Sequence, residues 1–437
     1  MAHVAPFRAL RYDSAQVDLA AVVTQPYDKI TPEMQDRYYA ASPHNLVRII
    51  LGKRQPADNS ANNSYVRAAS LFYDWRRQGI FRQDSRPSIY VYIQRFLIPG
   101  TETALERRGV IALGRIEDYS ANIVFRHEQT LAKPKADRLD LLRATRAHFG
   151  QIFMLYSDPA QEIESALPAT SQPDICVQDE YGVLHQLWSC SDSEVIEFFR
   201  ARMRARKLII ADGHHRYETA LAYRNERRAA STGQQSSSAD STPHDWVMMT
   251  LVNLEAPGLV ILPTHRVVHG LPAFSADVLR ENAKSLFSVE DVDPAIDDAR
   301  ARGILREAGR SGTALLAVTA SRAFLLDRPT SALSGSLAGL SLRQQSLDVV
   351  QLHKCLLEGV LGVSEEAIRN QTNVRYVRDA GEALARVREG AADVAFLMNP
   401  VRLHQVRDLA LAGEVLPQKS TDFYPKLLSG LTVYALD

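Results

Sequence analysis

The sequence has little cysteine, no long apolar run and no excess of charge of either sign. Its three cysteines, Cys176, Cys190 and Cys355, stand far apart and show no Cys-x-x-Cys spacing, which argues against a disulfide framework. No stretch approaches the roughly 20 apolar residues that a membrane-spanning helix needs. Lys plus Arg equals Asp plus Glu at 51 each, so no overall field attracts nucleic acid or an acidic membrane. Any anion-binding site must therefore be local.

The bulk composition is that of a globular protein. Hydrophobic residues make up 46% and charged residues 23% of 437 residues, enough for two or three domains. The opening stretch, residues 1–16, lacks the charged start and apolar core of a signal peptide. We therefore expect a cytoplasmic protein with no nucleic-acid or membrane partner. The composition leaves the oligomeric state open, a homo-oligomer included.

The pattern of apolar residues predicts an α+β fold with mixed α/β character. Residues 87–99 and 107–119 read as a β-hairpin, and 245–268 as a second hairpin turning at Pro257-Gly258. Between them, an amphipathic helix feeds the strand "KLIIAD", which in turn feeds the helix "HHRYETALAYRNERR". The Ser-rich stretch 229–244 is expected to form a mobile loop.

The pattern changes near residue 270, where we expect a boundary between domains 1–270 and 271–437. Beyond it, predicted helices alternate with short predicted strands. The helices are expected at 274–286, 294–308, 346–360, 379–389 and 401–412, and the strands at 314–319, 323–327, 373–378 and 393–398.

The stretch "LIIADGHHRYETAL", residues 208–221, crowds polar side chains behind an apolar strand and has three interpretations. As a phosphate cradle, Asp212 caps the helix, Gly213 lets the backbone turn or approach a ligand, and Arg216 grips phosphate beside the helix N-terminus. As a plain capped helix, the same residues are only solvated. A metal site is weaker, because His214 and His215 are adjacent and splay around a helix.

A second stretch, "IVFRHEQTLAKPKADRLDLL" at 123–142, places a carboxylate next to a histidine. The zinc-protease pattern H-E-x-x-H fails, because position 131 is leucine. What remains is Glu128 as a candidate general base beside His127, with Lys133, Lys135 and Arg138 as candidate phosphate ligands. The alternative is an exposed basic turn before a helix.

Two further stretches carry candidate anion ligands. "LPQKSTDFYPKLLSGL", 416–431, offers Lys419, Ser420, Thr421 and Lys426 in a loop fenced by prolines. It lacks the glycines of a P-loop, and a tail docked by its aromatic residues explains it equally well. "PTHRVVHG", 263–270, offers His265 and Arg266 at a strand end, facing either a site or solvent.

Together these stretches resemble a prokaryotic family of uncharacterised proteins, domain-of-unknown-function family 1015. The segments "PFRALRYD", "QPYDKI", "HNLVRI", "FRHEQT", "ADGHHRYETAL" and "PQKSTDFYPKLLSGL" match its pattern in order. The box at Gly213, Arg216, Tyr217 and Ala220 also resembles the phosphate-binding box of the ParB/sulfiredoxin superfamily. That resemblance implies a ParB/sulfiredoxin-like core domain, followed by a C-terminal α/β domain whose last loop, 416–431, returns to the site.

The same resemblance excludes some activities and favours another. His214 stands where sulfiredoxin carries its catalytic cysteine, which rules out sulfinic-acid reduction by that route. A Ser-rich loop and strands, not a helix-turn-helix, follow the box, so DNA partitioning is not expected. The run Asp212-Gly213-His214-His215-Arg216 is similar to the D-G-H-H-R box of free serine kinases, which implies bound ATP or ADP, with Mg²⁺, and a phosphate-bearing small molecule as ligand.

The leading hypothesis is therefore phosphoryl transfer to or from a small hydroxy metabolite, with free serine or phosphoserine as first candidate. The predicted catalytic residues are Glu128, His127, His215 and Asp212. The predicted phosphate- or nucleotide-binding residues are Gly213, His214, Arg216, Lys133, Lys135, Arg138, His265, Arg266, Lys419, Ser420, Thr421 and Lys426. No side-chain metal site is predicted. Two alternatives stay open: a non-catalytic nucleotide-binding module, and a metal-dependent hydrolase that uses His215.

Overall fold

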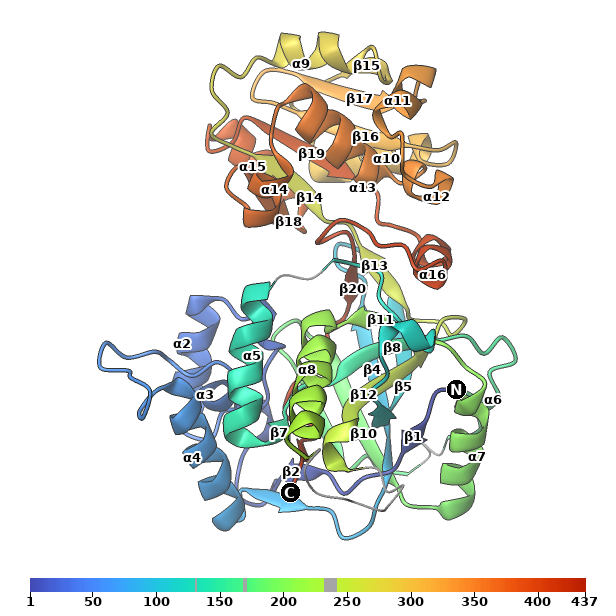
Figure 1. Ribbon diagram of the computed structural model, residues 1–437. Coiled ribbons are helices and arrows are strands. Elements are labelled where there is room, and N and C mark those ends of the chain that lie inside the picture. The colour runs from blue at the N-terminus through green and yellow to red at the C-terminus, as the bar shows by residue number, and fades with distance from the viewer. Residues whose placement is uncertain (130–131, 168–170, 232–241) are drawn as a thin grey trace. The chain divides into compact units, whose positions relative to one another are not determined.

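The computed structural model describes residues 1–129, 132–167, 171–231 and 242–437 (Figure 1). The chain forms two compact units. Unit 1 comprises Met1–Arg126, Thr130–Val260 and Pro425–Asp437, and unit 2 comprises His127–Gln129 and Ile261–Tyr424. The main boundary between the units lies at residue 260/261, whereas the apolar pattern placed it near residue 270. The chain's last 13 residues fall in unit 1 and not in the C-terminal domain.

Unit 1 is built on a mixed nine-stranded sheet in the order β6-β11-β8-β12-β5-β4-β10-β9, with β1 paired to β5. Strands β12 and β8 run parallel, as do β11 and β6, while the other neighbours in the sheet are antiparallel. The strands are β1 Val4–Ala5, β4 Ile89–Leu97, β5 Ala104–Arg115, β6 Val124–Phe125, β8 Ile152–Tyr156, β9 Ile175–Gln178, β10 Leu184–Cys190, β11 Leu208–Asp212 and β12 Trp246–Asn253.

The first predicted hairpin is confirmed, because β4 and β5 pair antiparallel from Tyr90 with Ile111 to Leu97 with Ala104. The second predicted hairpin is wrong. Strand β12 pairs with β5 and β8, while β13 (Val260–Leu262) pairs with β20 (Asp422–Tyr424). Gly258 does turn, with a positive φ of 84°. It also packs closely against the backbone of β5, because a Cβ there would lie 2.1 Å from the carbonyl oxygen of Glu106. Long-range partners, not the local turn, decide the pairing.

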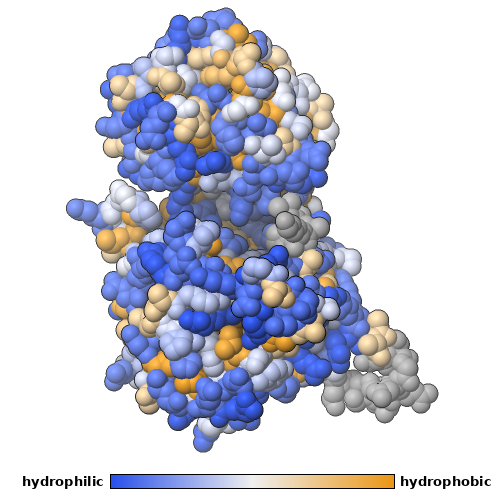
Figure 2. All heavy atoms as spheres, turned by 90° about the vertical axis from the view of Figure 1, so that its left-hand side faces the viewer, coloured by the Kyte–Doolittle hydropathy of each residue, from blue (hydrophilic) through white to orange (hydrophobic). Residues whose placement is uncertain are grey.

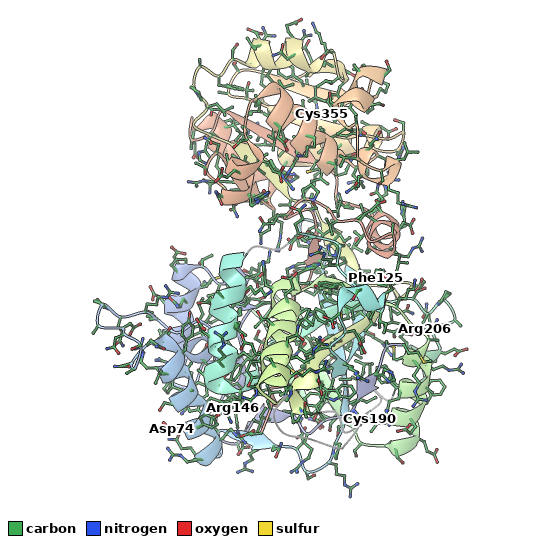
Figure 3. The ribbon with its side chains drawn as sticks, in the orientation of Figure 1. Asp74, Phe125, Arg146, Cys190, Arg206 and Cys355 are labelled. Atoms are coloured by element: carbon green, nitrogen blue, oxygen red, sulfur yellow. The ribbon has the colours of Figure 1, made fainter. Side chains whose placement is uncertain are left out.

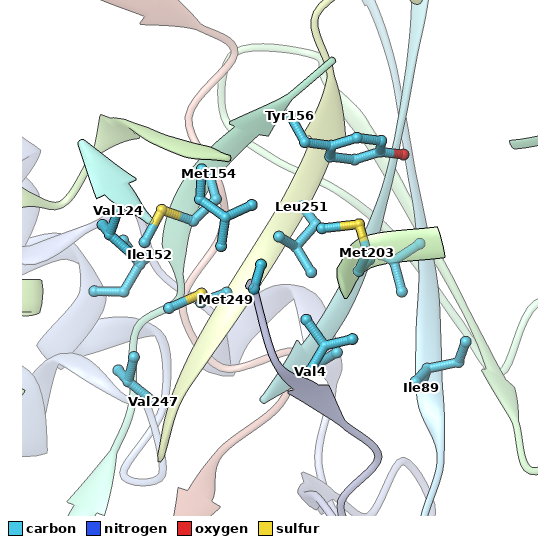
Figure 4. Close-up of a cluster of buried hydrophobic side chains, with 14 of the residues drawn as sticks. Val4, Ile89, Val124, Ile152, Met154, Tyr156, Met203, Val247, Met249 and Leu251 are labelled. Atoms are coloured by element: carbon cyan, nitrogen blue, oxygen red, sulfur yellow. The ribbon is translucent and has the colours of Figure 1, made fainter. Parts of the chain in front are cut away.

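Helices of unit 1 cover its apolar clusters. Side chains of α7 (Ser193–Arg204) and α8 (His214–Ser231) pack against the main sheet in the cluster that Figure 4 shows, where Met203 lies near Leu251. Helices α4 (Ser64–Arg77) and α5 (Ala132–Thr145) contribute to a second cluster with the small sheet of β2 (Leu10–Tyr12) and β3 (Phe81–Gln83). The other helices are α1 Leu19–Val22, α2 Pro32–Ala41, α3 Val47–Ile50 and α6 Glu162–Ala166.

The predicted Ser-rich loop, 229–244, is only partly described. Helix α8 continues to Ser231, so the first three residues of the stretch are helical and not loop. A short 3₁₀ turn, Pro243–Asp245, follows at the other end. The remaining predicted loop residues, 232–241, lie outside the described residues.

Unit 2 contains a six-stranded antiparallel sheet in the order β15-β17-β16-β19-β14-β18. Every helix and strand predicted beyond residue 270 is present, although residues 352–360 wind as a π-helix instead of an α-helix. The strands are β14 His265–Val268, β15 Ser288–Val292, β16 Ala314–Val318, β17 Ala323–Asp327, β18 Val374–Val377 and β19 Val394–Met398. The helices are α9 Ala276–Ala283, α10 Asp298–Ala308, α11 Ser331–Ser336, α12 Leu342–Gln345, α13 Asp348–Gln351, α14 Glu365–Asn370, α15 Ala380–Arg388 and α16 Leu403–Leu411.

The end of the chain belongs to unit 1 because its backbone is bonded there. Thr24 pairs with Ser429 and Leu10 with Val433 in isolated antiparallel bridges. Strand β21 (Tyr434–Ala435) then pairs with β7 (Ala147–His148). These bonds draw the second half of the 416–431 stretch into unit 1.

The surface is mainly polar on the face that Figure 2 shows, and the three cysteines form no disulfide. Figure 2 shows a face covered mainly by polar residues, with apolar side chains in small groups. Cys176 is exposed, while Cys190 in unit 1 and Cys355 in unit 2, both labelled in Figure 3, are buried, and all three are free thiols. Among the described residues, we find no helix that combines the length and the apolar character needed to cross a membrane.

Candidate functional site

The centre of the candidate site is the junction of β11, Gly213 and α8, and the predicted strand, glycine and helix are present there. Strand β11 ends at Asp212 and α8 begins at His214, so Gly213 alone makes the turn, with a φ of 92°. A Cβ on Gly213 would lie 3.0 Å from Nε of Arg216 and 3.1 Å from its Cζ. Both the backbone conformation and the folded-back arginine therefore require glycine here.

Two residues of the box serve to anchor the helix. The hydroxyl of Tyr217 donates to the carbonyl of Glu117 at 2.7 Å and accepts from the Glu117 amide at 2.9 Å. Tyr217 and Ala220 are both buried in the main core cluster. The aromatic and small positions of the box thus hold α8 against the sheet, which leaves ligand binding to its polar residues.

The side chain of Asp212, just before α8, contacts two cations, and its predicted role as a helix cap stays a prediction. One carboxylate oxygen accepts from Nη2 of Arg216 at 2.6 Å, and the other lies 3.3 Å from Nζ of Lys426. Arg216 also donates from Nη1 to the carbonyl of Gln151 at 2.5 Å. Because both oxygens of the carboxylate are taken by side-chain cations, Asp212 fixes the positions of an arginine and a lysine.

The protonation state of Asp212 follows from these neighbours. Burial on its own would raise the pKa of this carboxyl. The positive charges of Lys426 and Arg216, followed by that of Lys29, outweigh burial and hold the pKa well below its usual range. Asp212 is therefore ionised at neutral pH, and it is a weak base.

A pocket opens next to Arg216. Its walls come from the loop at Pro26-Tyr27, from α5, from the segment around Phe149-Gly150 and from α8. Its lining residues are Pro26, Tyr27, Ile50, Arg138, Leu141, Leu142, Ala147, His148, Phe149, Gly150, Ile152, Arg216, Thr219 and Ser429. The pocket is thus mostly apolar, with the guanidinium groups of Arg138 and Arg216 as its charged groups.

The predicted basic residues of α5 differ in their surroundings. Arg138 is held by the carboxylate of Asp137, donates to the carbonyl of Ile50 at 2.5 Å, and lies 4.1 Å from the ring centre of Tyr27. Lys135 is half-buried, and the hydroxyl of Thr219 reaches its carbonyl at 3.5 Å. The side chain of Lys133 lies outside the described residues.

The histidines of the box lie at the start of α8. His214 is buried and His215 is half-buried, and the charge of His214 further favours ionised Asp212. Within the described ranges, no three His, Cys, Asp or Glu side chains gather in a way that would hold a metal ion. The catalytic role predicted for His215 stays a prediction.

The sequence did not reveal a buried arginine in the same unit. Arg107 on β5 is 1% exposed, donates from Nε to the side-chain oxygen of Gln94 at 3.0 Å, and donates to the carbonyl of Pro425 at 2.5 Å. Burial lowers its pKa to about 10, and the charge of Asp212 acts against this. Strand alternation was the available signal, because residues 107 and 111 share a face and Ile111 is fully buried.

Unit 2 brings together three other predicted residues. The hydroxyl and the backbone amide of Thr421 both donate to Oε1 of Glu128, each at 2.8 Å. Nε2 of His127 lies 2.7 Å from the same hydroxyl. Because the single hydroxyl proton goes to the carboxylate, His127 is the donor in the second bond. Thr421 thus holds one oxygen of Glu128 in place.

The neighbouring predicted residues of this loop have structural contacts. The hydroxyl of Ser420 donates to the carbonyl of Pro417 at 2.6 Å, which closes the turn. The carbonyl of Lys419 accepts from Nη2 of Arg266 at 3.1 Å. Lys426 differs from them, since it lies in unit 1 with Asp212. The predicted phosphate loop is therefore divided between the two units.

His265 and Arg266 were predicted to serve one phosphate site, but they are adjacent on β14 and project to opposite faces of the sheet. Arg266 is fully buried, donates from Nε to Nε2 of His353 at 3.1 Å, and lies 4.9 Å from the ring centre of Tyr376. His265 lines a different pocket of unit 2. A phosphate-binding role for either residue stays a prediction.

The chain matches one protein family and is distantly similar to several solved structures. A family model described as "Protein of unknown function (DUF1015)" matches residues 4–350. A conserved hypothetical protein from Pyrococcus furiosus is similar in structure, with 12% identity, coverage of 69% of this chain and 87% of that chain, and a TM-score of 0.34. Free serine kinase in complex with AMP gives 14% identity, 69% and 83% coverage, and a TM-score of 0.33.

A third similar structure is SbnI with C-terminal truncation from Staphylococcus aureus, with 9% identity, coverage of 73% of this chain and 85% of that chain, and a TM-score of 0.34. No curated protein matches the chain. These structural similarities are distant, whereas the family match spans most of the sequence. The chain belongs to the family described as protein of unknown function, DUF1015.

Proposed function

We propose that unit 1 binds the phosphate groups of a nucleotide at the β11–α8 junction, and that the protein transfers a phosphoryl group to or from a small hydroxy metabolite. Free serine or phosphoserine is the first candidate, because the run Asp212-Gly213-His214-His215-Arg216 is similar to the box of free serine kinases. The observation that carries the proposal is the gathering of Lys426, Arg216 and Lys29 around Asp212 at a helix N-terminus.

Three cationic side chains act on the single carboxylate of Asp212, namely Lys426, Arg216 and Lys29. The first backbone amides of α8 add a partial positive charge at the same place. Such a cationic setting favours a phosphate group, and the guanidinium of Arg216 can bind two of its oxygens.

The adjoining pocket fits the remainder of such a ligand. Arg216 lines it, so a phosphate on this guanidinium leaves the rest of the molecule next to Ile50, Leu141 and Phe149. An apolar wall with few polar groups is typical of a site for a ring or another organic moiety. Arg138, stacked on Tyr27, closes the wall with a second guanidinium.

Mg²⁺ would accompany the nucleotide and neutralise charge on its phosphates. Asp212 is the carboxylate of this unit that would hold it, and its low pKa keeps it ionised. Its oxygens are bonded to Arg216 and Lys426, so the metal would reach them when these cations turn to the phosphates.

Phosphoryl transfer to a hydroxyl also needs a base, and we propose Glu128 for this role. Thr421 holds Oε1 of Glu128 by two hydrogen bonds, and no hydrogen bond to Oε2 is found within the described parts of the chain. A carboxylate with one oxygen fixed and the other available can accept a proton from a hydroxyl or, in the phosphatase direction, from water.

The decisive experiment is isothermal titration calorimetry of the full chain with ADP and Mg²⁺. Replacing Arg216 with Ala should weaken binding at least tenfold, because charge-assisted bonds to phosphate are lost. Arg200→Ala, at an exposed ion pair of α7 with Glu197, is the matched control and should bind like the wild type. Unchanged affinity of Arg216→Ala would refute the phosphate-binding role.

A non-catalytic nucleotide-binding module is the second candidate, because the lowered pKa of Asp212 makes this carboxylate of the β11–α8 junction a weak base. The Glu128→Gln variant separates the two functions. An enzyme should lose most of its phosphoryl transfer to serine, or release from phosphoserine, while ADP affinity stays the same. Absence of any turnover in the wild type, with intact ADP binding, would favour the module.

A further inference from the structure

Unit 2 contains a pocket whose walls are rich in arginine. It lies between α10, the residues just after it, and the segment that follows β19. Four arginines line it, Arg302, Arg306, Arg310 and Arg402. We call it the arginine pocket. It is formed by unit 2 alone, so it is separate from the β11–α8 junction of unit 1.

The three arginines of the first wall are spaced four residues apart. Arg302 and Arg306 therefore share one face of α10, and Arg310 follows just beyond the helix end at Ala308. At 1.5 Å per residue, the row spans about 12 Å. A row of this length suits an anion with several charges better than a monovalent ion.

Carboxylates neutralise only part of this charge. Arg302 pairs with Asp298 at 2.9 Å, and Arg310 pairs with Glu307 at 2.7 Å. Arg306 and Arg402 form no ion pair within the described ranges, and Arg402 donates to the carbonyl of Gly309 at 2.8 Å. Two guanidinium groups thus face the pocket without a carboxylate partner.

A buried histidine adds a hydrogen-bond donor to the lining of the arginine pocket. His265 is 2% exposed and lines the pocket, and its Nδ1 accepts from the amide of Met398 at 3.2 Å. Burial lowers its pKa to about 4, so the ring is neutral and Nε2 carries the hydrogen. The pocket lining thus includes one neutral N–H donor.

We propose that the arginine pocket binds a small phosphorylated metabolite that carries at least two negative charges. Arg306 and Arg402 bind its phosphate oxygens, and the Nε2–H of His265 donates to the same group or to a neighbouring oxygen. Leu305, Leu397 and Pro400 form an apolar wall for the organic part of the ligand. This second site does not depend on the function proposed for unit 1.

Pyrophosphate is a suitable probe, because it has the required charge and no organic part. In calorimetry on the full-length Arg216→Ala chain, which lacks the proposed phosphate ligand of unit 1, pyrophosphate should still bind at one site. Adding Arg306→Glu and Arg402→Glu should weaken this binding at least tenfold. If the affinity is unchanged by the two charge reversals, the proposal is wrong, and Arg306 only offsets the dipole of its helix.

Chemical modification locates the site directly. Phenylglyoxal should modify Arg306 and Arg402 at least fivefold more slowly when pyrophosphate is present, as measured by peptide mass spectrometry. Arg369, paired with Glu365 on α14 and 51% exposed, is the internal control and should react at the same rate with and without the probe. Equal protection of Arg369, or no protection of Arg306, would overturn the assignment.

His265→Gln tests the histidine without a change in charge. Glutamine keeps an N–H donor, so the pyrophosphate affinity of His265→Gln should lie within threefold of that of the parent chain. Leucine has no donor, so the pyrophosphate affinity of His265→Leu should be lower than that of His265→Gln. Equal affinities of the Gln and Leu variants would remove His265 from the site and leave the arginines to be judged by the modification experiment.

Discussion

Asp212 in unit 1 and Asp348 in unit 2 are both partly buried, yet their pKa values shift in opposite directions. Around Asp212, positive side chains outweigh burial and lower the pKa well below its usual range. Asp348 begins α13 and accepts from the amide of Ala314 at 3.4 Å, and burial raises its pKa to about 7.

The difference shows that the arrangement of neighbouring charges, more than burial itself, decides the protonation state of a carboxyl. Asp212 is bonded to a guanidinium and an ammonium group. Asp348 has a weak amide bond, and Arg402 acts on it only through space. The two units should therefore respond differently to the loss of a carboxylate and to pH.

The largest effect is expected for Asp212→Asn. The change breaks the ion pair between the carboxylate and Lys426, which is 8% exposed, and breaking a buried ion pair costs about 3–5 kcal/mol. Hydrogen exchange at pH 7 should show this loss in peptides of unit 1 and little change in unit 2.

Glu197→Gln, in an exposed ion pair of the same unit, is the control for Asp212→Asn and should change stability by less than about 1 kcal/mol. Adding Lys426→Met to Asp212→Asn should restore part of the lost stability, because it also removes the buried ammonium group of the broken ion pair. Wild-type protection of unit 1 in Asp212→Asn would contradict the importance of the cation cluster.

Asp348→Asn should stabilise unit 2 at alkaline pH. The folded pKa of about 7 lies above the unfolded value of 3.8, so the protonated acid favours the folded state. Its contribution is complete below pH 4 and is lost as the pH rises through 7. At pH 8 the variant should be more stable than the wild type by about 2 kcal/mol, an estimate reduced for partial solvent exposure.

Denaturant unfolding of unit 2 at pH 4, 6 and 8 measures this effect. The advantage of Asp348→Asn should vanish at pH 4 and grow toward pH 8. Asp291→Asn, at an exposed carboxylate paired with Arg280, should show no such trend. A pH-independent difference between Asp348→Asn and the wild type would show that the carboxyl does not titrate near neutrality.

The smallest effect is expected for Thr421→Val. This change removes the hydroxyl that donates to Glu128 and keeps the amide bond, so unit 2 should lose about 1 kcal/mol. Thr421→Ser restores the hydroxyl and should restore stability. If Glu128 is the base, Thr421→Val should also lower kcat more than it raises KM. Equal kcat values for the Val and Ser variants would show that the hydroxyl does not position Glu128.

Much of the fold was predictable because its signals are local. Alternating apolar residues located the β4–β5 hairpin, and the helices and strands predicted beyond residue 270 are present, although β15, α11, α12 and α14 were missed. The strand, glycine and helix at residues 208–228 were also confirmed. Such elements are specified by side-chain period and turn residues over about ten positions.

The site was less predictable, because its members come from distant segments. Strand alternation did contain one unused signal, since adjacent His265 and Arg266 must face opposite sides of β14. The pairing of β12 with β8 and of β13 with β20 had no local signal, and the apparent turn at Gly258 pointed to a hairpin instead.

By itself, the sequence determined the secondary structure of most segments, the need for glycine at position 213 and the presence of cations near an acidic box. Only the tertiary structure decided which cations meet which carboxylate. Lys426 reaches Asp212 across 214 positions because backbone bridges at Ser429 and Val433 return the chain end to unit 1. Charge interactions act over a few ångströms of space, and distance along the chain does not reveal them.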